Sequence, residues 1–246
     1  MTPSGIRSCN RPARTEKIPL ADWDAHLANL EARRTWMTNQ HFTSLHYTNS
    51  LGTDLTVGLP DNHIWQGGME ETASGILFNA NVPTEEIYSA PQADAVNGTV
   101  YSTRPLVYNG NTIDRFHLTF KDGKVVDAAA EIGEDVLKKL VAVDEGAGRL
   151  GEVALIPYAS PISLSGILFY ETLFDENASC HLALGASYPT CLKGGTELDK
   201  EGLSKAGLND SMIHVDFMVG SKDLTITGLK KDGTVVPVFT NGNWAE

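Results

Sequence analysis

The sequence predicts an α+β protein with a mixed β-sheet body and flanking helices. Residues after Gly52 are rich in β-branched and aromatic side chains and show the two-residue alternation of strands. Asp-Gly pairs within residues 121–124 and 231–234 separate alternating apolar runs, as the turns of β-hairpins do. Residues 20–37 and 134–143 instead place apolar side chains at the three- and four-residue steps of one helical face.

The N-terminal residues predict no folded element. Residues 1–17 carry four basic side chains against one acid, Glu16, and contain two prolines and no apolar periodicity. A segment of this composition cannot bury enough apolar surface to hold one conformation. We therefore expect a disordered leader over residues 1–17.

Residues 18–50 are interpreted as a helical junction segment, with Asp22 as a candidate helix cap. The apolar face of the helix comprises Leu20, Trp23, Leu27, Leu30 and Met37. Because a disordered leader offers nothing to pack against, this face must dock on the body of the protein or on another chain.

The remaining residues, 51–246, predict one domain in which strands dominate. Residues 54–59 alternate, and residues 100–120 form β-rich runs that are broken at Asn109-Gly110. One helix is expected between the two hairpins, over residues 134–143. No repeat period is visible, which excludes a solenoid.

Composition excludes several classes of protein. Lys and Arg number 19 against 31 Asp and Glu, and the net charge of −12 repels a nucleic-acid backbone. The first 20 residues lack the apolar run of a signal peptide, and no later stretch reaches the roughly 20 apolar residues of a membrane span. The cysteines Cys9, Cys180 and Cys191 are too few and scattered for a disulfide framework. Reduced thiols and a cytoplasmic location are therefore expected.

The most informative segment for chemistry is residues 211–219. Strand alternation places Ile213, Val215 and further apolar residues on one face, while His214 and Asp216 share the other. An imidazole and a carboxylate on one strand face can approach one metal ion together. Taken alone, this short motif favours a solvated His–Asp pair over a metal site.

A second segment gathers Asp175, Glu176 and His181 within seven residues. A continuous helix would place Glu176 and His181 about 140° apart, so they converge only if a turn or helix end intervenes. Asp175 and Asn177 suit such a turn and also suit helix capping. Metal ligation and capping remain equally supported here.

Two further carboxylate positions accompany predicted strands. Glu152 precedes the apolar run 153–157, which indicates a buried strand, and a carboxylate at its mouth is unfavourable unless paired or metal-bound. Glu85 and Glu86 are neighbours on an extended segment, so only one should face a given site. The residues alone do not decide which, and exposure of both is the simpler interpretation.

Taken in this order, the segments resemble the aminopeptidase T and aminopeptidase S family of metal-dependent aminopeptidases. The matching blocks are residues 23–26, 52–60, 81–86, 151–152, 173–181, 214–216 and 241–244. Together they extend over most of the chain, and several are long and uncommon. The resemblance implies that residues 51–246 are a metal-binding catalytic domain.

The resemblance also implies the site residues. The implied metal ligands are Glu86, Glu152, Glu176, His181, His214 and Asp216. Glu152 would bridge two divalent ions, and this ligand set suits zinc, cobalt or manganese. Tyr188 would stabilise the oxyanion, unless it is only a core or rim aromatic, and Glu85 would serve as a general base or contact the substrate amine.

The resemblance further implies that the chain acts on peptides and hydrolyses their N-terminal residue with a metal-activated water. It also implies a homodimer. Members of this family carry an N-terminal domain that this chain is expected to lack. An inactive, truncated fragment that binds metal and dimerises is therefore the alternative interpretation.

Overall fold

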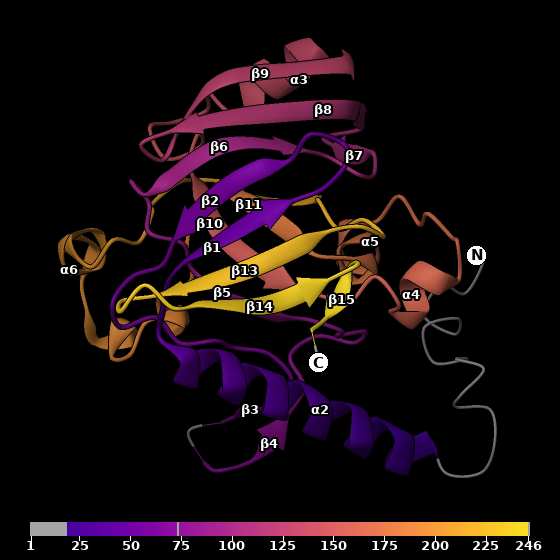
Figure 1. The fold of residues 1–246 in the computed structure, drawn as a ribbon, viewed down its shortest axis with the longest axis vertical. Coiled ribbons are helices and arrows are strands. Elements are labelled where there is room, and N and C mark those ends of the chain that lie inside the picture. The colour runs from indigo at the N-terminus through magenta and orange to yellow at the C-terminus, as the bar shows by residue number, and fades with distance from the viewer. Residues whose placement is uncertain (1–18, 73, 246) are drawn as a thin grey trace.

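The computed structural model describes residues 19–72 and 74–245, so the predicted leader lies outside the described residues. Antiparallel sheets form the body and helices flank it (Figure 1), which confirms the predicted α+β class. The helices are α2 (Pro19–Gln40), α3 (Glu134–Leu140), α4 (Pro161–Leu164), α5 (Thr172–Asp175) and α6 (Lys200–Lys205), with 3₁₀ turns η2 (Glu176–Ala178), η3 (Pro189–Cys191) and η4 (Gly195–Glu197). None of the helices in this described part combines the length and apolar character that crossing a membrane requires.

The strands form two antiparallel sheets and a separate hairpin. The larger sheet runs β15 (Asn243–Trp244), β14 (Val235–Thr240), β13 (Thr225–Lys230), β1 (Phe42–Thr48), β2 (Asp54–Gly58), β6 (Val96–Tyr101), β8 (Asn111–Lys121), β7 (Leu106–Tyr108), with β9 (Lys124–Ile132) also paired to β8. The second sheet runs β12 (His214–Met218), β11 (His181–Gly185), β10 (Leu150–Leu155), β5 (Ile87–Ser89). The hairpin consists of β3 (Glu70–Glu71) and β4 (Leu77–Phe78).

The core lies between the two sheets. One cluster of buried apolar side chains includes Leu45 and Leu55 of the larger sheet together with Val153 and Leu182 of the smaller one. The rings of Phe116 on β8 and Phe217 on β12 lie 5.6 Å apart, and such aromatic contacts add to the stability of burial. The four-stranded sheet therefore has one face in the core and one face free to build a site.

The first helix forms as predicted and docks on the same chain. Leu27, Leu30 and Met37 are buried, whereas Leu20 in the first turn is 77% exposed and does not join the apolar face. Asp22 lies inside the first turn rather than before it, so it cannot be the cap. Its negative charge there interacts favourably with the helix dipole. The segment 18–50 is not all helical, because residues 42–48 form β1, a central strand.

Both predicted hairpins are confirmed. Lys121 pairs with Lys124, and Asp122 and Gly123 both have positive φ, as a two-residue hairpin turn of the favoured twist requires. At the second turn, Lys230 accepts from Gly233 and donates to Thr234. The predicted helix at residues 134–143 is present as α3 and ends at Leu140.

Candidate metal centre

One face of the four-stranded sheet carries the candidate ligands in register. Glu152 on β10 pairs with Ala183 on β11, and Ala183 pairs with Asp216 on β12. Residues directly opposite one another in antiparallel strands project from the same face. Two carboxylates therefore flank a small side chain in one row across the sheet.

The histidines occupy neighbouring rows on that face. His181 pairs with Ala154, and His214 pairs with Gly185. With Ala183 between the carboxylates, the floor of the site consists of small residues, which leaves space above the sheet. A cavity of about 250 Å³ occupies this space.

Glu152 lies within its strand rather than at the strand mouth, which corrects the sequence interpretation. The apolar run begins at Val153, but β10 begins at Leu150 because its backbone also pairs with β11, with an irregular register between Leu150 and Glu152. Such bulges redirect a side chain and often lie beside functional sites. The carboxylate is consequently buried, with 5% of its surface exposed.

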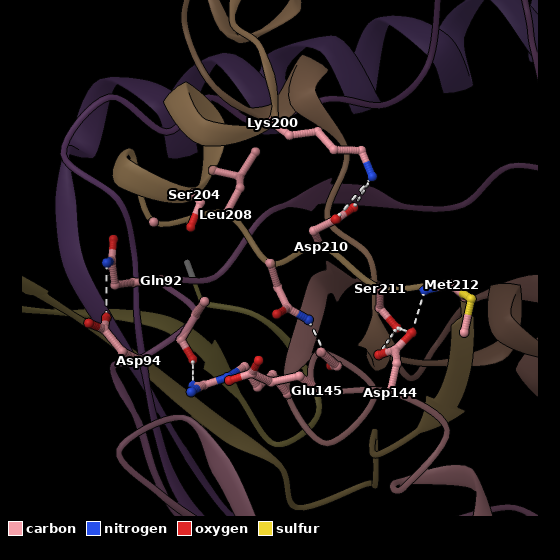
Figure 2. Close-up of a pocket in the computed structure, with 15 residues that line it drawn as sticks. Gln92, Asp94, Asp144, Glu145, Lys200, Ser204, Leu208, Asp210, Ser211 and Met212 are labelled. Carbon is pink, nitrogen blue, oxygen red and sulfur yellow. Dashed lines mark hydrogen bonds and ion pairs between the residues drawn. The ribbon is translucent and has the colours of Figure 1, made fainter.

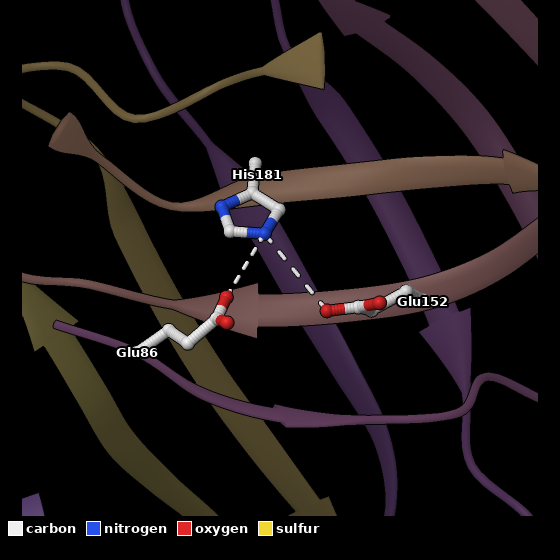
Figure 3. A group of neighbouring side chains, drawn as sticks. All are labelled: Glu86, Glu152 and His181. Carbon is white, nitrogen blue, oxygen red and sulfur yellow. Dashed lines mark ion pairs between the residues drawn. The ribbon is translucent and has the colours of Figure 1, made fainter. Parts of the chain in front are cut away.

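Two groups of potential ligands meet at Glu152. The Nε2 atom of His181 lies 3.1 Å from Oε2 of Glu86 and 3.9 Å from Oε1 of Glu152 (Figure 3). The Nε2 atom of His214 lies 3.1 Å from Oε2 of Glu152 and 3.4 Å from Oδ1 of Asp216. Each carboxylate oxygen of Glu152 thus faces a different histidine, and each group of three could hold one cation.

Backbone carbonyls orient both imidazoles. The Nδ1 atom of His181 lies 3.1 Å from the carbonyl oxygen of Glu176, and Nδ1 of His214 lies 2.8 Å from that of Ala186. A carbonyl oxygen can only accept, so Nδ1 is the protonated nitrogen of the neutral ring. Nε2 then presents its lone pair to the cavity, as a metal-binding histidine requires.

Burial and the mutual contacts of these groups shift their pKa values in the metal-free protein. Burial raises the pKa of Glu152 to about 7 and that of Glu176 to about 8. Burial alone would lower the pKa of His181, but the neighbouring carboxylates, Glu86 foremost, raise it to about 10. Burial likewise lowers the pKa of His214, but Asp216 and Glu152 outweigh this effect and raise it to about 11. Protons therefore balance the buried carboxylates when no cation does so.

The residues fit a divalent metal. Oε2 of Glu86 is buried and contacts Nε2 of His181 at 3.1 Å as an ion pair, but it has no partner in hydrogen-bonding geometry among the described residues, although buried carboxylate oxygens are normally satisfied. Carboxylate oxygens and imidazole nitrogens are hard or borderline donors, which suit zinc, cobalt or manganese better than copper(I). A cation at this position would supply the missing partner.

The structure brings most of the predicted site residues to this cavity. Its lining includes Glu86, Glu152, Glu176, His181, Tyr188, His214 and Asp216. Glu176 lies in η2, so a turn does separate it from His181, but it lies outside the two groups of three. Tyr188 is 43% exposed, and its ring lies 4.8 Å from that of His214.

Glu85 takes a different position. Its Oε2 lies 3.8 Å from Nε2 of His26 on α2, and the lining of the metal cavity includes Glu86 but not Glu85. The backbone N–H of Glu85 donates to Oδ1 of Asn177, which fixes the segment just before Glu86. The predicted catalytic role of Glu85 stays a prediction.

A larger cavity of about 670 Å³ lies between α6 and residues 144–149 (Figure 2). Its charged groups are largely engaged with neighbours: Lys200 pairs with Asp210, and the carboxylate of Asp144 accepts from Ser211 and from the N–H of Met212. The described lining of this cavity lacks the convergence of imidazoles and carboxylates that marks the smaller one.

Comparison with known proteins identifies the family. The sequence model of the thermophilic metalloprotease (M29) family matches residues 12–244 of this chain. The chain belongs to the M29 family. All six candidate ligands of this M29 chain lie within the matched residues.

Relatives of this M29 chain include aminopeptidase 2 of Geobacillus stearothermophilus, 53% identical over 92% of this chain, and aminopeptidase AmpS of Bacillus subtilis (strain 168), 53% identical over 94%. Aminopeptidase T of Thermus aquaticus is 45% identical over 93% of the chain. The M29 chain spans only 55%, 56% and 55% of the lengths of these three relatives.

Two solved structures share the fold. Wild-type AmpT from Thermus thermophilus matches with a TM-score of 0.88 at 43% identity, over 93% of this M29 chain and 56% of that chain. A 2,5-dihydroxypyridine dioxygenase from Pseudomonas putida KT2440 matches with a TM-score of 0.59 at 13% identity. The match covers 90% of this chain and 62% of the dioxygenase chain. The second likeness concerns the fold alone, so function rests on the site.

Four described residues that line the M29 site were not predicted as site residues: Glu70, Ala80, Asn81 and Tyr88. Tyr88 pairs with Ala154 and follows Glu86 by two positions, so strand alternation was a signal that could have found it. Glu70 belongs to the β3–β4 hairpin, and no local pattern connects it with the other residues.

Proposed function

We propose that this chain is the metal-binding, catalytic part of an aminopeptidase that hydrolyses the N-terminal residue from peptides. The observation that carries the proposal is the pair of ligand groups that share Glu152 in a chain of the M29 family. The names of the relatives support peptides as the substrate class. Two bound divalent ions would polarise the scissile carbonyl and lower the pKa of a water toward neutrality.

The residues divide the work of holding that centre. Glu152 is the proposed bridge, because its two oxygens face His181 and His214 separately. Glu86 completes the first group, and Asp216 completes the second. Glu176 is proposed as the fourth carboxylate because it lines the cavity, where burial, together with nearby carboxylates, raises its pKa and a cation would compensate its charge.

Tyr188 is proposed to donate a hydrogen bond to the oxyanion. Burial, together with the nearby carboxylates, raises the pKa of its phenol to about 12, so the hydroxyl keeps its proton at neutral pH. The ring lies beside His214 at the edge of the cavity, where a substrate carbonyl would approach. A fixed donor at a developing negative charge is an effective catalytic device.

The proposal is tested by release of p-nitroaniline from an aminoacyl p-nitroanilide. Metal-free protein should gain activity with zinc, cobalt or manganese and lose it again with chelator. His214→Ala is the matched inactive control, because it removes one ligand and leaves the fold of β12 in place. A folded sample that binds metal and releases no product would exclude the proposal for this chain.

That outcome would favour a second candidate, a fragment that binds metal without turning over peptide. Its support is the coverage of the relatives, of which this chain spans about half. A homodimer is proposed under both candidates, and light scattering after gel filtration measures it. A monomer at micromolar concentration would exclude the dimer.

A further inference from the structure

The metal cavity is too small to hold more than the end of a peptide. Its volume is about 250 Å³, whereas pockets for drug-sized ligands occupy roughly 300–1,000 Å³. Most of its lining is proposed to hold metal ions. The rest of a bound peptide must therefore leave the cavity along another part of the surface.

Glu70 marks where the cavity continues. This residue on β3 lines the metal cavity and also lines a groove of about 620 Å³ between α2 and the β3–β4 hairpin. Both elements lie side by side below the body of the molecule in Figure 1. The groove and the metal cavity thus share one wall.

The groove has fixed walls. Oδ1 of Asn79, just after β4, accepts from the indole N–H of Trp23 on α2 at 3.1 Å. The Nδ2 group of Asn79 donates to the carbonyl oxygen of Gly68, just before β3, at 2.8 Å. One side chain therefore ties both ends of the hairpin to the helix.

The lining combines exposed apolar surface with an excess of negative charge. Leu77 is 62% exposed in the groove, and exposed apolar surface beside a site commonly marks binding. Among the described residues, the acids of the lining are Asp24, Glu31, Glu70 and Glu71, and the single base is Arg34. Arg34 lies 2.5 Å from a carboxylate oxygen of Glu31, so its charge is already compensated within the groove.

We propose that this groove binds the peptide chain on the C-terminal side of the scissile bond and selects against acidic residues there. The inference rests on the proposed aminopeptidase function. Backbone and apolar side chains of the peptide would lie along Leu77, and the excess carboxylates of the described lining would attract lysine or arginine and repel aspartate or glutamate.

The charge preference is tested with two pentapeptides that differ only at the third residue, lysine or glutamate. The wild type should cleave the lysine peptide about fivefold more efficiently in kcat/KM, and the difference should shrink at high salt. Glu71→Lys should abolish or invert this ratio. Glu145→Lys is the matched control, because Glu145 is an exposed acid of the other large cavity, and it should leave the ratio as in the wild type.

The position of the groove is tested by obstruction. Leu77→Trp should lower the ratio of kcat/KM for a neutral pentapeptide to that for an aminoacyl p-nitroanilide about tenfold, because the anilide does not extend into the groove. Val235→Trp, at a 59% exposed position on the larger sheet, is the matched control and should leave both values unchanged. An unaltered ratio in Leu77→Trp would overturn the inference.

Binding is measured independently of turnover by fluorescence anisotropy of a pentapeptide labelled at its C-terminus. Leu77→Trp should weaken binding about tenfold relative to Val235→Trp. Equal affinities would overturn the inference even if the protein is an active aminopeptidase. Weakened binding by a protein that cleaves no substrate would retain the groove and reject only the proposed activity.

Discussion

Replacement of Glu152 by glutamine is the change that most sharply separates a bridging ligand from a terminal one. Glutamine keeps the shape of the side chain but exchanges one carboxylate oxygen for an amide nitrogen that cannot bind metal. In the structure one oxygen lies 3.9 Å from Nε2 of His181, and the other lies 3.1 Å from Nε2 of His214. The substitution therefore affects both groups of ligands at once.

The magnitude follows from the ligand count. Each group contains three residues and shares Glu152, so the substitution removes one donor atom on one side, and loss of the negative charge weakens the remaining oxygen on the other. A loss of metal affinity of about 100-fold corresponds to about 2.7 kcal/mol of binding free energy. Metal at 100 times its Kd stabilises the native protein by about the same amount. For a domain of this size, that equals a rise in Tm of roughly 5–10 °C.

The assay combines metal content after gel filtration with thermal unfolding in chelator and in excess zinc. The wild type should hold two ions per chain and show the rise in Tm, whereas Glu152→Gln should hold none and show no rise. Glu145→Gln, at an 88% exposed carboxylate, is the control and should behave as the wild type. One ion retained tightly by Glu152→Gln would refute the bridging role.

Other substitutions and pH probe the remaining parts of the site. His214→Ala should abolish activity and lower the metal content to about one ion per chain, measured by mass spectrometry of the metal. Tyr188→Phe should lower kcat about 100-fold with metal content intact, which would separate an oxyanion donor from a rim aromatic. Ala183→Leu should displace metal by filling the floor of the site, seen as lost metal-induced stabilisation in a protein that still folds.

In the metal-free protein the pKa of His214 is raised to about 11 and that of Glu176 to about 8, so bound protons compete with cations. Metal affinity should therefore rise from pH 6 to 8. Calorimetry in buffers of different ionisation enthalpy should report proton release on metal binding.

Local patterns predicted the parts of the fold that depend on nearby residues. The helical spacing before residue 40 and the two Asp-Gly turns report contacts within a few residues, and all three elements formed. Alternation also placed His214 and Asp216 on one face of a strand, because that face is set by chain geometry alone.

Local patterns could not predict the features that depend on contacts between residues far apart in the sequence. The start of β10 is set by pairing with β11, so the position of Glu152 inside the strand was missed. The choice between Glu85 and Glu86 depends on which side of the segment meets α2 and which meets the sheet. Glu70 reaches the cavity only because its hairpin folds beside α2.

Anomalous scattering from crystals grown with zinc or manganese tests the central claim most directly. The account predicts two peaks, one bounded by Glu86, His181 and Glu152 and the other by Glu152, His214 and Asp216, with a different oxygen of Glu152 on each. A single peak, or two peaks of which only one contacts Glu152, would contradict it.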